Sequence, residues 1–208
     1  MFAVEAFVEM INSIKSDEYE FTIRETRTKD IISQVANMQS EIGILYLSDF
    51  NKNVINKLLR EKHLVFHPLF RANLHVFISR DNPLAGKKKV TMEDLKPFPF
   101  IQYEQGSEGS FYFAEEAVWP EYSPKQINVT DRATILNFII GLNGYTVCTG
   151  IDNGDLNNEK IVTVPLDTDE TMLLGWITNE RAKLSTAAQT YLDKLRTVIA
   201  SHGYKLID

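Results

Sequence analysis

The sequence is poor in cysteine and carries no excess of positive charge. Its one cysteine, Cys148, lies in an apolar run of the 208-residue chain, so we expect no disulfide framework and predict a buried, inert thiol. Acidic residues outnumber basic ones by 28 to 22, which gives a net charge of −6. The chain therefore lacks the excess of basic residues that is typical of a nucleic-acid-binding domain. The short basic run 87–89 is interpreted as a solvated turn.

Long hydrophobic runs and catalytic motifs are also missing. No stretch approaches the ~18 consecutive apolar residues of a membrane span, and no signal peptide is recognisable. A cytoplasmic protein without membrane contact is therefore predicted. Glycine-rich nucleotide-binding motifs and the Gly-x-Ser-x-Gly motif of hydrolases are absent from the sequence. His63 and His67 would lie about 13 Å apart on a strand, too far to share one metal ion. We predict no enzymatic activity, no metal site and no cofactor.

Alternating strand and helix patterns fill the chain. The segment 126–150 is the clearest example, because the strand Ile127–Val129, a capped helix from Arg132 and the strand Tyr145–Thr149 form a β-α-β unit. Such alternation predicts an α/β protein with mainly parallel sheets. The other expected strands are Tyr19–Arg24, Ile42–Leu47, Leu64–Leu69, Leu74–Ser79, Phe98–Tyr103, Ile161–Leu166 and Met172–Thr178. The other expected helices are Phe2–Ile14, segments after Thr28, Asn51 and Ser185, a single turn after Thr91, and about Ser110 to Trp119.

Two of these helices have unusually wide apolar faces. In the Arg132–Leu142 helix, one stripe contains Ile135 and Ile139, and a second stripe contains Leu136 and Ile140. The apolar residues cover more than half of the helical wheel, whereas a surface helix needs little more than ~100°. The Phe2–Ile14 helix has a similar pattern. One stripe on each helix can cover the chain's own core, and the other predicts a partner.

Several fragments together resemble the C-terminal effector-binding domain of bacterial LysR-type transcriptional regulators. Their order and spacing over nearly the whole chain carry the resemblance, whereas each fragment alone is weak. The fragments are Glu41-Ile-Gly-Ile-Leu45, Leu64-Val-Phe-His-Pro-Leu69, His75-Val-Phe-Ile-Ser79, Asn82-Pro-Leu-Ala85, Val90-Thr-Met-Glu-Asp-Leu95, Val129-Thr-Asp-Arg-Ala-Thr134 and Gly141-Leu-Asn-Gly144.

The resemblance implies a two-lobed fold like that of type 2 periplasmic binding proteins, with an effector cleft between the lobes. Lobe one would comprise residues 1–72 and 164–208, and lobe two residues 73–163. The chain would cross between the lobes near 69–75 and 161–166. A full-length family member also carries a winged helix-turn-helix, a linker helix and the first strand of lobe one, which this sequence does not contain. DNA binding would therefore require a domain outside this chain.

Effector-site residues are predicted at the carboxyl ends of the strands, where helix N-termini and unpaired backbone N–H groups meet. Donors at this edge suit a carboxylate and Asp131 suits an amine, so an amino acid or a small carboxylate is the expected effector. Helix capping is the alternative role of Thr130, Asp131 and Ser110. The predicted site residues are Tyr46, Leu47, Ser48, Tyr103, Gln105, Gly106, Ser107, Thr130, Asp131 and Thr149.

The resemblance also implies a homodimer, with a tetramer left open for the full-length protein. In the family, the first helix of lobe one packs against the central helix of lobe two from another subunit. The predicted interface residues are Val4, Val8, Ile11, Leu136 and Ile140. Without the family's first strand, the Tyr19–Arg24 and Ile42–Leu47 strands would have unpaired edges. A stand-alone solute-binding protein of the same fold and a purely structural dimerisation module are the alternative functions.

Overall fold

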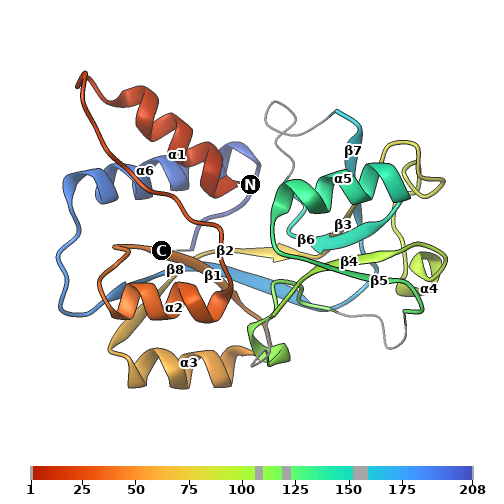
Figure 1. Cartoon of the computed structure of the whole chain (residues 1–208), viewed down its shortest axis with the longest axis horizontal. Helices are drawn as coiled ribbons and strands as arrows, with labels where there is room; N and C mark the ends of the chain where they lie inside the picture. The colour runs from red at the N-terminus through yellow and green to blue at the C-terminus, as the bar shows by residue number, and fades with distance from the viewer. Residues whose placement is uncertain (1, 106–109, 119–122, 152–158, 208) are drawn as a thin grey trace. The chain divides into compact units, whose positions relative to one another are not determined.

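The computed structural model describes residues 2–105, 110–118, 123–151 and 159–207, which form two compact units (Figure 1). Unit 1 contains Met1–Leu47, Lys52–Arg71 and Leu173–Asp208, and unit 2 contains Ser48–Asn51 and Ala72–Met172. The chain therefore returns to unit 1 between Met172 and Leu173, not near 161–166 as the sequence suggested. The difference arises because strand β7 (Ile161–Pro165) pairs with β3 (His75–Ser79) along its whole length inside unit 2.

Unit 1 is built on a three-stranded sheet with the strand order β1-β8-β2. Figure 1 shows α1 and α6 on one side of this sheet and α2 and α3 on the other. The core includes Phe2 and Phe70, whose rings meet edge to face at 5.4 Å. The elements are α1 (Phe2–Ser13), α2 (Thr28–Ala36), β1 (Gly43–Leu47), α3 (Lys52–Glu61), β2 (Leu64–Asn73), β8 (Thr171–Asn179) and α6 (Thr186–Ser201).

Glycine at position 43 allows helix α2 to pack closely on β1. A Cβ atom there would lie 2.5 Å from Cγ2 of Ile31 and 3.1 Å from Cγ2 of Val35. The strand β1 pairs antiparallel with β8, with Gly43 opposite Ile177. The apolar run that predicted a strand covered on both faces is confirmed in β1, where four of the five residues are buried.

The predicted strand Tyr19–Arg24 is wrong, because the structure contains no strand in this segment. Tyr19, Phe21 and Ile23 alternate as expected, yet they are 56%, 39% and 45% exposed. Phe21 contacts Phe7 of α1 edge to face and stacks on Tyr19. A strand needs a neighbour for its backbone N–H and C=O groups, and within the described residues β1 pairs with β8 alone. The alternating pattern was therefore not sufficient to form a strand.

Unit 2 contains a five-stranded sheet with the order β5-β4-β6-β3-β7. The strand β4 (Phe100–Tyr103) lies between β5 (Gln126–Val129) and β6 (Tyr145–Cys148) and runs parallel to both. The strand β3 runs antiparallel to β6 and β7, so the sheet is mixed. The helix α5 (Arg132–Leu142) lies across the sheet and buries Ile135 and Ile139 (Figure 1).

Two short elements complete unit 2. The capping box predicted at Thr91 is present, because its side chain accepts from Asp94 N–H while Asp94 accepts from Thr91 N–H, and it begins α4 (Met92–Leu95). The helix predicted from about Ser110 to Trp119 is wrong over residues 114–118, because only the 3-10 turn η1 (Phe111–Phe113) forms. Ala114 is extended, and the nearby Glu116 is buried. Trp119 lies outside the described residues.

Candidate functional site

Three parallel strands of unit 2 end at the same edge of the sheet. Tyr103 at the end of β4 lies opposite Val129 at the end of β5. Phe100 lies opposite Tyr145, so β6 runs in the same direction and ends at Cys148 on the same edge. Polar residues follow each of these strand ends, as the sequence analysis expected. This carboxyl edge of unit 2 is the candidate site.

Asp131 at the carboxyl edge is the N-cap of helix α5. Its Oδ1 accepts from the backbone N–H of Thr134 at 2.9 Å, and its Oδ2 accepts from the Thr134 hydroxyl at 2.7 Å. These two hydrogen bonds hold the pKa of the Asp131 carboxyl below its usual value, and the bond from the Thr134 hydroxyl is the larger cause. Asp131 therefore caps helix α5, which was the alternative role expected for it. Both Asp131 and Thr130 are exposed, so capping does not remove them from contact with a ligand.

Thr149 and Gly150 follow β6 at the same edge. The hydroxyl oxygen of Thr149 accepts from the backbone N–H of Ile151 at 3.5 Å, and the side chain is half-buried. Gly150 has a φ of +80°, which is costly for residues with a Cβ atom. The preceding thiol of Cys148 is half-buried, not buried as predicted.

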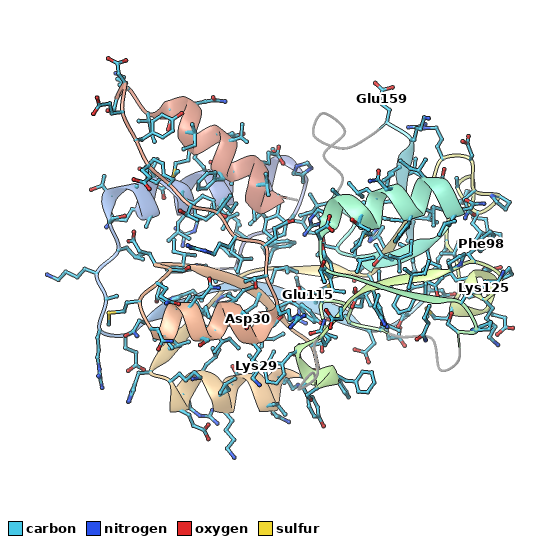
Figure 2. The ribbon with its side chains drawn as sticks, in the orientation of Figure 1. Lys29, Asp30, Phe98, Glu115, Lys125 and Glu159 are labelled. Atoms are coloured by element: carbon cyan, nitrogen blue, oxygen red, sulfur yellow. The ribbon has the colours of Figure 1, made fainter. Side chains whose placement is uncertain are left out.

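A buried carboxyl group that was not predicted from the sequence lies next to β4. Glu116 is 2% exposed, and its Oε1 accepts from the backbone N–H of Tyr103 at 3.0 Å. Loss of hydration raises the pKa of this carboxyl to about 8, and the nearby Glu115 charge adds to the increase (Figure 2). Glu116 fixes the backbone at the end of β4, from which Gln105 continues. No sequence pattern indicated this burial, because Glu116 fell within the helix predicted from about Ser110 to Trp119.

Gln105 donates from Nε2 to the carbonyl oxygen of Tyr103 at 3.2 Å, so its side chain folds back over the strand end. The other predicted members of this loop, Gly106 and Ser107, lie outside the described residues. At the opposite end of the strands, Lys125 lies beside Phe98 and donates from Nζ to the carbonyl oxygen of Pro97 at 2.8 Å (Figure 2).

The three site residues predicted at the end of the Ile42 strand are all buried. Tyr46 and Leu47 end β1 in unit 1, where they lie opposite Leu174 and Leu173. Ser48 belongs to unit 2, and its backbone N–H donates to Oδ1 of Asn51 at 2.8 Å. Their exposed fractions are 5–6%. These three side chains are therefore buried.

An exposed aromatic pair lies beside this segment and was not predicted. Phe50 stacks on Tyr112 with ring centroids 4.7 Å apart and an interplanar angle of 19°. Phe50 is 48% exposed and Tyr112 is 37% exposed, so the pair offers an apolar surface to solvent. Sequence patterns could not identify it, because the two residues are 62 positions apart.

The described residues offer neither a metal cluster nor a membrane-spanning helix. They contain no group of three or more His, Cys, Asp or Glu side chains arranged to hold a metal ion. No helix in these residues has the length and apolar character needed to cross a bilayer.

Comparison with known families gives a direct match. A sequence model of the LysR substrate binding domain matches residues 17–200. The chain belongs to this family. Its members are regulatory domains of transcriptional regulators, and their fold resembles that of periplasmic binding proteins. The family and fold class expected from the fragment pattern are therefore confirmed. A search of curated proteins found no match.

Solved structures of LysR regulatory domains share the fold at low sequence identity. The MetR regulatory domain from N. meningitidis has a TM-score of 0.63 and 14% identity, over 100% of this chain and 92% of that one. The reduced OxyR regulatory domain from Pseudomonas aeruginosa has a TM-score of 0.63 and 15% identity, over 94% of this chain and 91% of that one. The effector binding domain of QuiR in complex with shikimate has a TM-score of 0.59 and 15% identity, over 96% of this chain and 90% of that one.

Proposed function

We propose that this LysR-family domain senses a small carboxylate or amino acid and controls transcription in the cytoplasm of a bacterium. The observation that carries the proposal is the shared carboxyl edge of β4, β5 and β6, where Gln105, Thr130, Asp131 and Thr149 follow the strand ends. Hydroxyl and amide groups beside the N-terminus of α5 suit a carboxylate ligand. Support also comes from QuiR, whose bound shikimate is a hydroxylated carboxylic acid.

The domain acts by binding alone in this proposal, and it catalyses no reaction. The proposed site residues are Tyr103 at the end of β4 and the residues that follow the strand ends of unit 2, namely Gln105, Thr130, Asp131 and Thr149. Binding energy would change the equilibrium between conformations or assemblies of the regulator, which requires different affinities for the two states. That change would alter how a DNA-binding domain, which is not in this sequence, binds its DNA.

A thermal-shift screen tests the effector class. The full chain is mixed with amino acids, small di- and tricarboxylates and shikimate, and one group of related acids should raise the melting temperature. A ligand at 100 times its dissociation constant adds ~2.7 kcal/mol to the unfolding free energy. The Thr149→Val variant should bind that ligand at least about tenfold more weakly, because a charge-assisted hydrogen bond is lost. Thr197→Val, on α6, is the control and should bind normally. No stabilisation by any acid would contradict the proposal.

We further propose that the domain forms a homodimer through α1 and α5 of different subunits. Val4 and Ile11 on α1 are half-buried, and Val8 is 41% exposed. On α5, Leu136 and Ile140 are also half-buried. Covering such apolar surface contributes roughly 25 cal/mol per Å². A two-fold axis would repeat this contact.

Sedimentation equilibrium of α5 variants tests the dimer. Leu136→Glu places a charge in the proposed interface and should give a monomer at micromolar concentration. Asn137→Glu adds the same charge at an exposed neighbouring position and should leave the dimer intact. A monomeric parent protein would refute the interface, and so would equal association of the parent and the Leu136→Glu variant.

A further inference from the structure

His75 lies at the same edge of unit 2 as the proposed effector site, although no site residue was predicted there. It is the first residue of β3, between β6 and β7 in the sheet, and is opposite Cys148 and Pro165. Because β3 runs antiparallel to β6, its amino end meets the carboxyl end of β6. The half-buried imidazole of His75 is therefore a neighbour of the segment Thr149–Gly150.

Two contacts fix the orientation of the His75 ring. Its Nδ1 lies 3.1 Å from the backbone carbonyl oxygen of Asn73. A carbonyl oxygen only accepts, so Nδ1 donates and the neutral ring keeps a lone pair on Nε2. The ring also lies against Gly150, where a Cβ atom would be 2.6 Å from Cγ and 2.7 Å from Cε1 of His75. Glycine at this position is what allows the imidazole to occupy its place.

Nε2 of His75 is the remaining polar atom of this ring, and no described residue forms a hydrogen bond with it. It therefore offers an acceptor in a fixed orientation at the carboxyl edge. Asp131 also offers acceptor atoms at this edge, although each of its carboxylate oxygens already accepts one hydrogen bond from Thr134. Nε2 thus offers a ligand donor an acceptor atom to which no described residue donates.

We propose that His75 determines the specificity of the effector site by accepting, at Nε2, a hydrogen bond from a hydroxyl or ammonium group of the ligand. The effector is then a hydroxy acid or an amino acid, and not a carboxylic acid that lacks such a donor. This inference rests on the proposed function, since it assigns a chemical class to the ligand of that same site.

Matched pairs of acids test the inference by calorimetry at one pH. Malate and succinate differ by one hydroxyl group, and glutamate and glutarate differ by one ammonium group; shikimate is a fifth probe. We expect the parent protein to bind the donor-bearing member of at least one pair about tenfold more tightly, as a hydrogen bond of ~1.4 kcal/mol requires. In His75→Leu this discrimination should disappear. His75→Gln, whose amide oxygen can reach the place of Nε2, should restore part of it.

NMR spectra of the histidine ring protons give a second measurement that needs no variant. The chain has four histidines, and His63 and His202 of unit 1 serve as internal controls. With any probe that raises the melting temperature, the His75 signals should move and the control signals should stay in place. A probe that binds without moving the His75 signals, or equal discrimination in His75→Leu, overturns this inference and leaves the proposed function intact. If none of the five probes binds, the proposed effector class fails and the role of His75 fails with it.

Discussion

The buried carboxyl of Glu116 should make the stability of this domain fall as the pH rises. Its pKa is raised from 4.5 to about 8 in the folded protein, so between these values the folded state holds a proton that the unfolded state has released. When the folded state binds more protons, the unfolding free energy decreases with increasing pH. The contribution of Glu116 is therefore fully present below about pH 4.5 and is lost by about pH 8.

The expected size of this effect follows from the two pKa values. A difference between 4.5 and about 8 corresponds to an upper limit of ~5 kcal/mol, at 1.36 kcal/mol for each pH unit. Local opening around the ionised carboxylate lowers the observed value, because water then reaches the charge. We expect a loss of at least ~2 kcal/mol between pH 5 and pH 9.

The variant Glu116→Gln isolates this contribution. Its amide oxygen can still accept from the backbone N–H of Tyr103, and it carries no charge at any pH. Urea denaturation of both proteins at pH 5, 6, 7, 8 and 9, followed by circular dichroism, gives the difference in unfolding free energy. Other titrating groups cancel in that difference. The variant should match the parent near pH 5 and be the more stable protein at pH 9.

Glu115→Gln is the matched control for the same experiment. It removes a negative charge next to Glu116 but keeps the buried carboxyl (Figure 2). Because burial is the larger cause of the raised pKa, this variant should keep most of the parent's pH dependence. A parent and a Glu116→Gln variant whose unfolding free energies differ by the same amount from pH 5 to pH 9 would refute the reasoning.

Two further predictions concern the fold. Ser185→Ala should lower the unfolding free energy by ~1 kcal/mol in urea denaturation, because the Ser185 hydroxyl accepts from Ala188 N–H at the start of α6, whereas Ser185→Thr should keep the cap. Gly175→Ala should cost ~1–3 kcal/mol, because the new Cβ would lie 2.6 Å from the His67 carbonyl oxygen, and Gly86→Ala, with no atom within 4 Å, should cost little. Equal unfolding free energies of Ser185→Ala and Ser185→Thr would contradict the role of the cap, and equal values for Gly175→Ala and Gly86→Ala would contradict close packing at Gly175.

Local sequence patterns determined most helices and strands of this protein. The helix α5 begins at Arg132 and ends at Leu142 as predicted, because the capping Asp131 and the left-handed Asn143 act over a few residues. The capping box at Thr91 is equally local. Hydrophobic periodicity also identified the strands whose partners exist. The order of the family fragments then identified the fold.

Tertiary structure decided the features that depend on distant residues. Tyr19–Arg24 has the alternation of a strand but no strand to pair with in the described structure, so it stays outside the sheet. No sequence pattern marks Glu116, and only the folded structure shows that its carboxyl group is buried and accepts from the Tyr103 backbone N–H. His75 contacts Gly150, which is 75 positions further along the chain, so no local pattern predicts this contact. Each depends on contacts across the sheet, and sequence periodicity carries no information about which strands become neighbours.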